Sequence, residues 1–556
     1  MAKPLLALVI VFLAGTAGCA GRWTGSPPSA LDSPPVYRLT LRIRPDDHRL
    51  EVSGTVRISA ADTIRTDLRL SLSERMRELR VEVMEPSVSA GLAKLERVSG
   101  NGSGSSVKWI LRPTRPIPPG QSVVLRFSYT GGGEVTRMYY IGPELAFASA
   151  WGTDWYPLVN SASDKGTGDL TVAVPAGWNV VTGGARRSSA EEEAQGTFRF
   201  AILHPTYFSF TAGNYAVVRH DGAVPLSAYL LTHRDHIESY LGGVDAILRA
   251  LIAEFGTYPF DELVLVEVPR ELASQAGFNA FATPGLMVMN SRAFDAPEVK
   301  YLLEWLGHEI SHQWFPHVVA LRTPPGLYME EALAEYGGLR TVETIAGPEA
   351  ARRMRVSGFE FDPIYSAAAY FKSVGAGVDQ PLADLQPSLE HRNLAYNKGS
   401  LIFDMLSREI GRDKFQRILH EITRRHRFQS ITWHEFVNTI AADSSRNLDW
   451  FFDQWFGRTG APDFRLSWSQ EGDTLRGVIT QPAPFYRAHL KVEMRDHGDQ
   501  RLVRVVEISG ARADFVVRAS FRVQSAVLDP DFEVLRWTPE YRAAADTARS
   551  KRDQRR

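Results

Sequence analysis

The sequence predicts a multidomain α+β protein, because the chain is long and its hydrophobic periodicity changes twice. It has 556 residues, whereas one domain typically takes about 100–200. Apolar and polar residues alternate from Val36 to about Val218, apolar residues then recur at helical spacing to about Trp455, and the alternation returns until Trp537. We therefore expect an N-terminal β domain over 36–220, a mostly helical domain over 221–457 and a small C-terminal β-sandwich over 458–540.

The composition is that of an ordinary globular protein. Hydrophobic residues make up 44% and charged residues 23% of the chain, which excludes a disordered, collagen-like or coiled-coil protein. Lys and Arg number 63 against 64 Asp and Glu, so the net charge is −1. Proteins that bind nucleic acids usually carry a basic excess that neutralises phosphates, so we expect no nucleic-acid partner.

Residues 1–18 have the pattern of an export signal. Lys3 precedes an apolar run over 5–13 and small residues over 14–18, and Cys19 follows. The apolar run is too short to span a bilayer, and no later run reaches about 18 residues. We expect this signal peptide to be removed and the mature chain to contain no transmembrane helix.

Cys19, the only cysteine, stands at the predicted cleavage point. Ala17-Gly18-Cys19 resembles a bacterial lipobox, although Thr16 stands where the lipobox has Leu; an ordinary signal with an incidental cysteine is the alternative. The resemblance implies a lipid-modified Cys19 that anchors an exported protein on the periplasmic side of a membrane or at the cell surface. The residue after it, Ala20, is not Asp, which favours the outer membrane. Residues 19–35 are rich in proline and predict an extended tether.

The N-terminal block predicts antiparallel strands. Its apolar residues recur at every second position, as in Tyr37, Leu39, Leu41 and Ile43, and turn residues such as Gly131-Gly132-Gly133 separate the runs. At the other end of the chain, residues 541–556 are charged, and we expect a solvated, frayed tail.

A helix in the central block carries the candidate chemistry. Asp295 and Glu298 have the spacing of a capping box, which predicts a helix that runs to about Phe315. This segment contains His308-Glu309-Ile310-Ser311-His312, the H-E-x-x-H pattern. Histidines at i and i+4 project from one helical face and can reach a single Zn²⁺, while the Glu between them can take a proton from a bound water.

A third metal ligand is needed, and Glu331 fits. It follows His312 after 18 residues and lies in a segment that predicts the next helix, residues 328–336. Structural zinc sites usually close all four positions with Cys or His, whereas two histidines and one glutamate leave a position for water. We therefore predict one catalytic Zn²⁺ per chain, held by His308, His312 and Glu331.

Taken together, these residues resemble the aminopeptidase N and leukotriene hydrolase family of zinc metallopeptidases. Tyr396-Asn397-Lys398-Gly399 matches the family's Tyr-x-Lys-Gly motif, and residues 448–456 resemble its closing helix. The resemblance implies a β-saddle domain, a thermolysin-like catalytic domain and a β-sandwich, in that order. It also implies that peptides are the substrates, that Glu309 is the general base and that Tyr396 stabilises the oxyanion.

One departure from the family concerns substrate recognition. Counting back from Gly285 places the family's Gly-x-Met-Glu-Asn motif on residues 279–283, so Ala280, Phe281, Ala282 and Gly285 are the candidate substrate-binding residues. The motif's glutamate grips the free α-amine of the substrate in the family, and here it is Ala282. Other carboxylates can take over this role, and three are candidates by sequence proximity alone: Glu330, Glu271 and Glu335.

Three functions remain open at this point. The first is an aminopeptidase-like zinc metallopeptidase. The second is a non-catalytic scaffold lipoprotein that keeps the zinc for structure. The third is a zinc hydrolase without a preference for free amines, either an endopeptidase or an enzyme for another class of substrate.

Overall fold

The computed structural model describes residues 34–59, 66–84, 94–98, 106–112, 116–133, 135–159, 165–322, 326–358, 366–386, 388–498 and 500–555. The chain forms two units, one made of the residues up to Gly242 with Phe260–Pro297, the other of Gly243–Pro259 with Glu298 onward. Helix α3 (Ile237–Phe255) crosses from one unit to the other. The predicted signal peptide, Cys19 and most of the tether lie outside the described residues.

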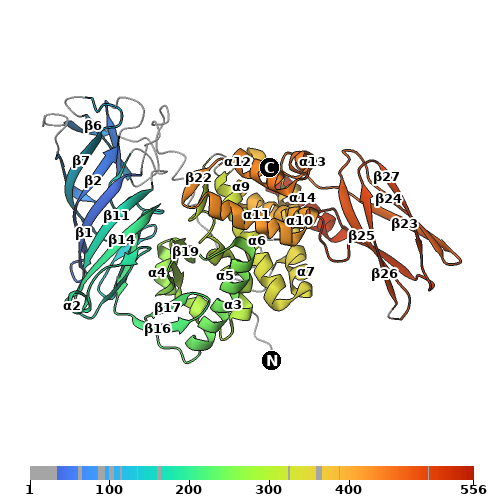
Figure 1. The fold of residues 1–556 in the computed structure, drawn as a ribbon, viewed down its shortest axis with the longest axis horizontal. Helices are drawn as coiled ribbons and strands as arrows, with labels where there is room; N and C mark the ends of the chain where they lie inside the picture. The colour runs from blue at the N-terminus through green and yellow to red at the C-terminus, as the bar shows by residue number, and fades with distance from the viewer. Residues whose placement is uncertain are drawn as a thin grey trace. The chain divides into compact units, whose positions relative to one another are not determined.

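The first unit begins with a seven-stranded sheet (Figure 1). Its strands, in spatial order, are β13 (Ala185–Arg186), β14 (Thr197–Thr206), β11 (Gly166–Ala173), β1 (Val36–Arg44), β2 (Arg49–Ser59), β7 (Ser122–Gly132) and β4 (Arg77–Val83). The predicted alternation is confirmed in β1, where Leu39 and Leu41 are buried. The expectation of purely antiparallel pairing is wrong, because β1 pairs with β11 in parallel.

Two four-stranded sheets and a short helix complete this β-rich region. One sheet has β10 (Leu158–Val159), β3 (Leu68–Ser73), β6 (Ser106–Arg112) and β5 (Lys94–Val98). The other has β12 (Asn179–Val181), β15 (Ser209–Gly213), β9 (Leu145–Ser149) and β8 (Tyr139–Ile141). Helix α2 spans Ala190–Ala194. Side chains from all three sheets share one hydrophobic core, in which the alternating apolar residues are buried.

The first unit also contains a five-stranded mixed sheet, although helical patterns were expected to dominate after residue 221. Its order is β16 (Ala216–Asp221), β17 (Pro225–Leu230), β18 (Leu263–Val268), β20 (Leu286–Asn290) and β19 (Ala280–Thr283). Strand β18 pairs in parallel with β17 and β20, and all six of its residues are buried. Short helices α4 (Arg270–Gln275) and η1 (Ser291–Phe294) flank β19 and β20 in the chain. Strand β19 is an edge strand of the sheet.

The second unit is mostly helical in its first part. The helices are η2 (Val299–Leu302), α5 (Leu303–Ser311), α6 (Gly326–Ala346), α7 (Pro348–Ser357), α8 (Ala367–Ala376), η3 (Leu382–Asp384), α9 (Leu389–Leu394), η4 (Ala395–Gly399), α10 (Ser400–Ile410), α11 (Arg412–Arg425), α12 (Trp433–Ser444) and α13 (Asp449–Trp455). Strands β21 (Val319–Leu321) and β22 (Gln429–Ile431) form a small parallel sheet. Among the described residues, no helix is both long and apolar enough to cross a membrane.

The predicted capping box at Asp295 is wrong. Asp295 ends η1, and its carboxylate accepts hydrogen bonds from Arg234 at 2.9 and 3.1 Å, so it is not free to cap a helix. The regular helix α5 begins later, at Leu303, after the turn η2. The predicted helix is therefore shorter than expected at both ends, and His312 follows its last residue.

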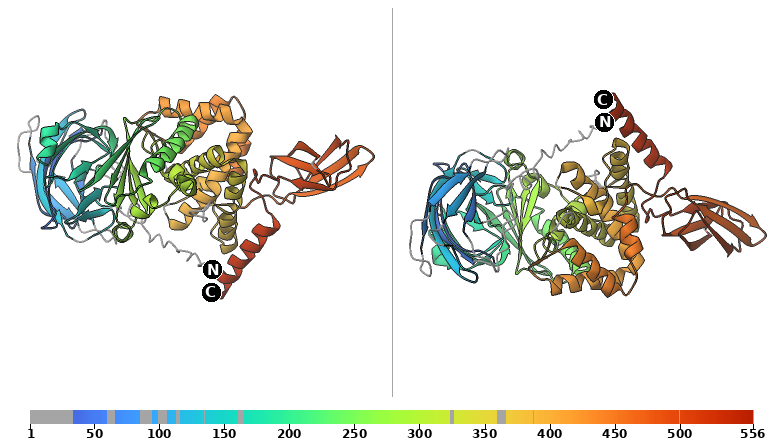
Figure 2. Two further views of the ribbon diagram at one scale, coloured as in Figure 1. Left: turned by 90° about the horizontal axis from the view of Figure 1, so that it is seen from below. Right: turned by 90° about the horizontal axis from the view of Figure 1, so that it is seen from above.

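Two three-stranded sheets and a helix follow. One sheet has β23 (Arg465–Glu471), β24 (Thr474–Thr480) and β27 (Arg512–Arg518); the other has β26 (Arg501–Ile508), β25 (Ala488–Arg495) and β28 (Ser525–Leu528). The chain then forms α14 (Pro539–Arg555), drawn as a continuous helix in both views of Figure 2, where a frayed tail was expected. Tyr541 and Ala545 are buried, and α14 packs on α8, which explains why the charged segment is ordered.

Candidate metal centre

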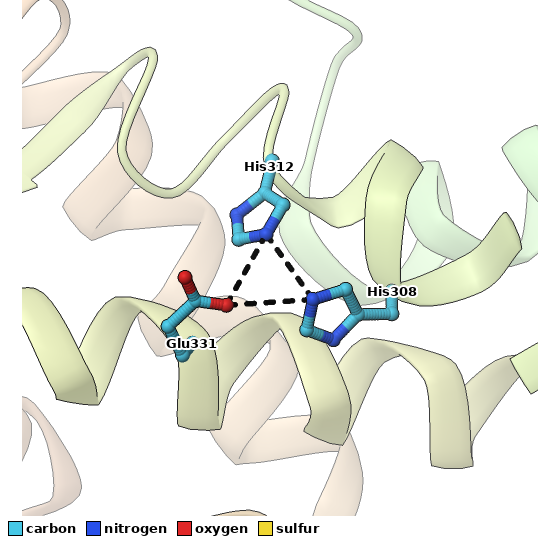
Figure 3. A group of neighbouring side chains, drawn as sticks. All are labelled: His308, His312 and Glu331. Atoms are coloured by element: carbon cyan, nitrogen blue, oxygen red, sulfur yellow. Dashed lines mark hydrogen bonds and ion pairs between the residues drawn. The ribbon is translucent and has the colours of Figure 1, made fainter. Parts of the chain in front are cut away.

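Two histidines and one glutamate converge at one point (Figure 3). His308 lies on α5, His312 follows directly after α5, and Glu331 lies on α6. The Nε2 atoms of the two histidines are 3.2 Å apart, and each lies 3.5 Å from Oε2 of Glu331. The predicted ligand set is therefore brought together by the fold.

The triangle formed by these three atoms has the size that zinc requires. Zn²⁺ binds histidine nitrogen at about 2.0–2.1 Å, so tetrahedral ligand atoms lie about 3.3–3.4 Å from one another. The measured separations are 3.2 and 3.5 Å, and the point equidistant from the three atoms lies about 2.0 Å from each. His308, His312 and Glu331 thus fit a zinc ion without rearrangement, and three protein ligands leave the fourth position of a tetrahedral zinc ion for water.

Close packing of α5 on α6 makes this convergence possible. A Cβ atom on Gly307 of α5 would lie 2.8 Å from Oγ1 of Thr341 and 3.0 Å from Cα of Gly338, both on α6. Only glycine fits at such a contact, so the two helix backbones approach closely there. The approach carries Glu331 to the two histidines of α5.

The remaining ring nitrogens are held by hydrogen bonds that fix which nitrogen faces the metal. Nδ1 of His308 lies 3.1 Å from Oε2 of the buried Glu335, one helical turn after Glu331. Nδ1 of His312 lies 2.8 Å from the carbonyl oxygen of Phe315. Both acceptors require a proton on Nδ1, which leaves Nε2 of each histidine as the metal ligand.

The charges at the site stabilise one another in the metal-free state. Burial alone would raise the pKa of Glu331, but hydrogen bonds from His308 and His312 hold it well below its usual value. Burial alone would lower the pKa of each histidine, and the contact with Glu331 outweighs this and raises both values. Burial raises the pKa of Glu309, only partly offset by the two histidines. A raised pKa suits a group that accepts a proton near neutral pH.

Tyr396 lies beside the metal ligands. Its ring stacks on His308 with centroids 5.2 Å apart and an interplanar angle of 20°, and its hydroxyl donates a hydrogen bond to Oε2 of Glu331. The residue belongs to η4, a single π-helical turn between α9 and α10. Such turns insert one extra residue into a helix and are frequent at functional sites.

Its neighbours in the turn fix the position of Tyr396. A Cβ on Gly399 would lie 2.6 Å from Cβ of Ala332, so this glycine allows the turn to rest on α6 next to Glu331. The buried ammonium of Lys398 donates to the carbonyl oxygen of Arg458 at 2.6 Å, and burial lowers the pKa of Lys398 to about 8. Lys398 and Gly399 of the Tyr-x-Lys-Gly motif therefore hold the backbone of the turn in place and so fix the position of the Tyr396 hydroxyl.

The predicted substrate-binding residues lie on and beside the edge strand β19. Ala280 and Ala282 are half-exposed on one face of the strand, and Gly285 forms the following turn with a φ of +71°. Phe281 points to the other face, where it is buried and packs against Phe278 with ring centroids 5.0 Å apart. The side chain of Phe281 therefore belongs to the core, and a role of this residue in substrate binding stays a prediction that concerns its backbone.

The three carboxylates considered as replacements for the missing glutamate have different surroundings. Oε1 of the buried Glu330 accepts the backbone N–H of Leu321 at 2.5 Å. Glu335 accepts from His308, and Glu271 is exposed on α4. Sequence analysis missed the contact of Glu335 with His308, which its position four residues after Glu331 on one helix could have indicated.

Comparison with known proteins identifies the domain that carries this centre. Residues 253–455 match the family model described as the peptidase family M1 domain. The chain therefore contains a peptidase family M1 domain. The matched segment contains the three ligands, Glu309 and Tyr396, so the M1 domain and the candidate metal centre coincide.

Relatives of the M1 domain are distant. The chain is 23% identical over 273 residues to aminopeptidase 2 of Candida albicans, covering 48% of this chain and 29% of that protein. It is 24% identical over 371 residues to aminopeptidase N of Streptomyces lividans, covering 60% of this chain and 40% of that protein. The chain thus spans less than half the length of these two relatives.

One solved structure shows a related fold. A mutant form of an M1 zinc metallopeptidase from Deinococcus radiodurans matches with a TM-score of 0.60 and 19% sequence identity. The match covers 78% of this chain and 97% of that one. It supports the multidomain α+β fold of an M1 peptidase, with a β-rich N-terminal region and a helical domain.

Proposed function

We propose that this chain is a zinc-dependent metallopeptidase that hydrolyses peptide bonds, with an aminopeptidase-like site. The proposal rests above all on the three-ligand centre, in which two nitrogens and one oxygen lie at zinc-binding separations. When bound, Zn²⁺ would supply a Lewis acid that lowers the pKa of water and stabilises negative charge.

Glu309 and Tyr396 would carry out the proton transfer and the stabilisation of the oxyanion. Glu309 accepts the proton of the attacking water and returns it to the leaving amine, which its raised pKa favours. Tyr396 donates its hydroxyl to the oxygen on which charge develops. For this it exchanges its present acceptor, Oε2 of Glu331, for the substrate, and the stacked ring keeps the hydroxyl close by.

Strand β19 would bind the substrate. It is an edge strand, and edge strands offer unpaired N–H and C=O groups to an extended peptide. Its open face carries only the methyl groups of Ala280 and Ala282. We propose that the peptide is held mainly through its backbone here, while the sheets after residue 464 form the family's β-sandwich.

The second candidate is a zinc hydrolase without a preference for free amines, and Ala282 is the observation that favours it. A buried ammonium without a carboxylate partner loses a charge-assisted hydrogen bond worth about 1.5–3 kcal/mol. Glu330 and Glu335, both buried, already accept hydrogen bonds from Leu321 and His308. A non-catalytic scaffold is the third candidate, and a set of three ligands that includes a glutamate argues against it, because structural zinc sites usually have four Cys or His ligands.

One experiment separates these functions. Hydrolysis of a peptide and of its N-acetyl form is measured with the wild type, with Glu309→Gln and with a control, Glu349→Gln, whose side chain is exposed on α7. The proposal expects Glu309→Gln to keep its zinc and lose at least about a hundredfold in kcat. Equal turnover in wild type and Glu309→Gln would refute it, and no turnover in any variant would support the scaffold.

We further propose that the protein is exported and tethered by a lipid on Cys19, on the periplasmic side of a membrane or at the cell surface. The supporting observations are the short apolar run and the lipobox-like Ala17-Gly18-Cys19. Acyl chains contribute about 0.8 kcal/mol per buried CH₂, so two or three chains would anchor the protein stably.

A further inference from the structure

A cavity of about 230 Å³ lies in the second unit, and the proposed peptidase function makes no use of it. Helix α13 contributes Trp450 and Phe451, α10 contributes Met405, and strands β25 and β26 contribute Lys491 and Val505. An engineered apolar cavity of about 150 Å³ holds benzene. A molecule the size of indole therefore fits this cavity.

The walls of the cavity are fixed to one another. The amide of the buried Gln454 on α13 makes two hydrogen bonds with Arg487, to its N–H at 2.7 Å and its carbonyl oxygen at 2.9 Å. Trp455 packs on Tyr486 with ring centroids 5.3 Å apart. On α10, Arg408 forms an ion pair with Glu533. These contacts hold the elements that line the cavity in fixed positions relative to one another.

The lining of the cavity has more basic than acidic residues. Four Lys or Arg residues line the cavity against two Glu residues. The two glutamates, Glu409 and Glu533, are only 14% and 13% exposed, because Arg, Lys and His partners surround them. Arg446, Arg487 and Lys491 are 50%, 41% and 34% exposed. Arg487 and Lys491 also pair with Glu507 and Asp531 at 2.8 and 3.2 Å, and these two carboxylates are 48% and 49% exposed, so a ligand carboxylate would take their place.

The geometry also provides a flat apolar surface. The guanidinium of Arg487 stacks over the ring of Trp450 at 4.6 Å from its centroid. Trp450 is half-buried, whereas its neighbour Phe451 is buried beneath. A stacked Arg and Trp pair offers an aromatic surface together with guanidinium N–H donors. Such a pair can bind an aromatic molecule that carries a carboxylate group.

We propose that this cavity, which we call the Trp450 pocket, binds a small aromatic carboxylic acid. Its ring lies against Trp450 and Val505, and its carboxylate receives hydrogen bonds from Arg487 and Lys491. The pocket is separate from the three metal ligands, since none of them lines it.

The test measures binding of indole-3-propionate to the full chain by isothermal titration calorimetry, beside the neutral indole-3-propionamide. We expect saturable binding of the acid and at least tenfold weaker binding of the amide. Aromatic acids can also bind zinc, so the titration is repeated with metal-stripped protein. Binding in the Trp450 pocket survives removal of the metal, and binding that disappears with it would overturn the proposal.

Three variants locate the ligand. Trp450→Ala and Arg487→Gln should each weaken binding at least tenfold, and Val505→Trp should block it by filling the cavity. The matched control is Arg512→Gln, an exposed arginine on β27 whose ion-pair partner is Asp514. Unchanged zinc content and thermal midpoint show that each variant is folded. Equal affinity in wild type and Val505→Trp, or no saturable binding by wild type at millimolar acid, would overturn the proposal.

Discussion

Glu335 and His308 are joined by a hydrogen bond of 3.1 Å between Oε2 and Nδ1, both buried and on neighbouring helices. Carboxylates in this position orient a metal-bound imidazole and raise its basicity, and their loss typically costs 10–100-fold in metal affinity. We predict that Glu335→Gln weakens zinc binding by about 10–100-fold. Competition with a chelator measures the dissociation constant, with the exposed Glu349→Gln as control. Unchanged affinity would show that Glu335 does not support His308.

Removing the hydroxyl of Tyr396 should affect turnover alone. Tyr396→Phe keeps the ring that stacks on His308 and loses only the O–H donor. Loss of one oxyanion donor costs about 10²–10³ in kcat, so we expect a decrease of that size with KM, zinc content and thermal midpoint nearly unchanged. The control is Tyr486→Phe, whose hydroxyl donates to Thr459 outside the metal centre. A lower zinc content would instead assign Tyr396 a role in holding Glu331.

The open face of β19 should make the enzyme tolerant of blocked N-termini. Because Ala282 offers no carboxylate, an acetyl group in place of the ammonium leaves no buried charge unpaired. We predict that kcat/KM differs little between a peptide and its N-acetyl form, and that Ala282→Glu raises the preference for the free amine by up to about 10–150-fold. Ala280→Glu, on the same face, is the control for added charge. A thousandfold preference in wild type would contradict this prediction.

The buried Asp404 should make stability depend on acidity. Its carboxylate accepts from Arg355 and Arg412 at 3.0 Å and from Arg408 at 3.3 Å. Burial alone would raise the pKa of Asp404, but these three arginines hold it far below its usual range. Because the folded pKa is depressed, the stabilisation is fully present above the unfolded value of about 3.9 and is lost as the pH falls below it.

We therefore predict that Asp404→Asn destabilises the protein by about 3–5 kcal/mol at pH 7, since it removes a carboxylate partner from the buried Arg355 and from Arg408 and Arg412. Thermal unfolding followed by circular dichroism measures the midpoints of both proteins. The difference in midpoint between wild type and Asp404→Asn should become smaller from pH 4 to pH 3, because the wild type loses the stabilisation by Asp404 in this range. Asp514→Asn, in the exposed pair with Arg512, should change the midpoint little. Equal midpoints of wild type and Asp404→Asn at pH 7 would contradict the prediction.

The lipid anchor proposed at Cys19 can be tested by membrane fractionation. We predict that the wild type stays in the membrane fraction after a high-salt wash and that Cys19→Ser is released, because acyl chains supply the anchoring energy. The matched control is Ser29→Ala, a change in the predicted tether that leaves Cys19 in place. Mass spectrometry of the mature N-terminus checks the modification. A Cys19→Ser protein that remains in the washed membrane would exclude the lipid anchor.

Local signals in the sequence predicted much of this structure. The alternation of Leu39 and Leu41 placed β1, and the spacing of His308 and His312 placed two ligands on one helical face. Glu331 followed from its distance along the chain and from the need for a third ligand, and the fold brings it to within 3.5 Å of both histidines.

The features that sequence analysis missed depend on partners distant in the chain. Asp295 does not cap a helix because Arg234, 61 residues away, takes its carboxylate. Strand β1 pairs in parallel with β11, more than a hundred residues later, which no local pattern reveals. The motif position of Phe281 also does not show that the pleat of β19 turns its side chain toward Phe278.

The metal centre is assembled from a short piece of chain. His308 and Glu331 are 23 positions apart, and both lie on helices that touch through Gly307 and Gly338. The chain between them is short, so bringing these two residues together costs less conformational entropy than a longer connection would. All three ligands come from α5, the residue after it and α6, so zinc binding and the packing of these two helices stabilise each other.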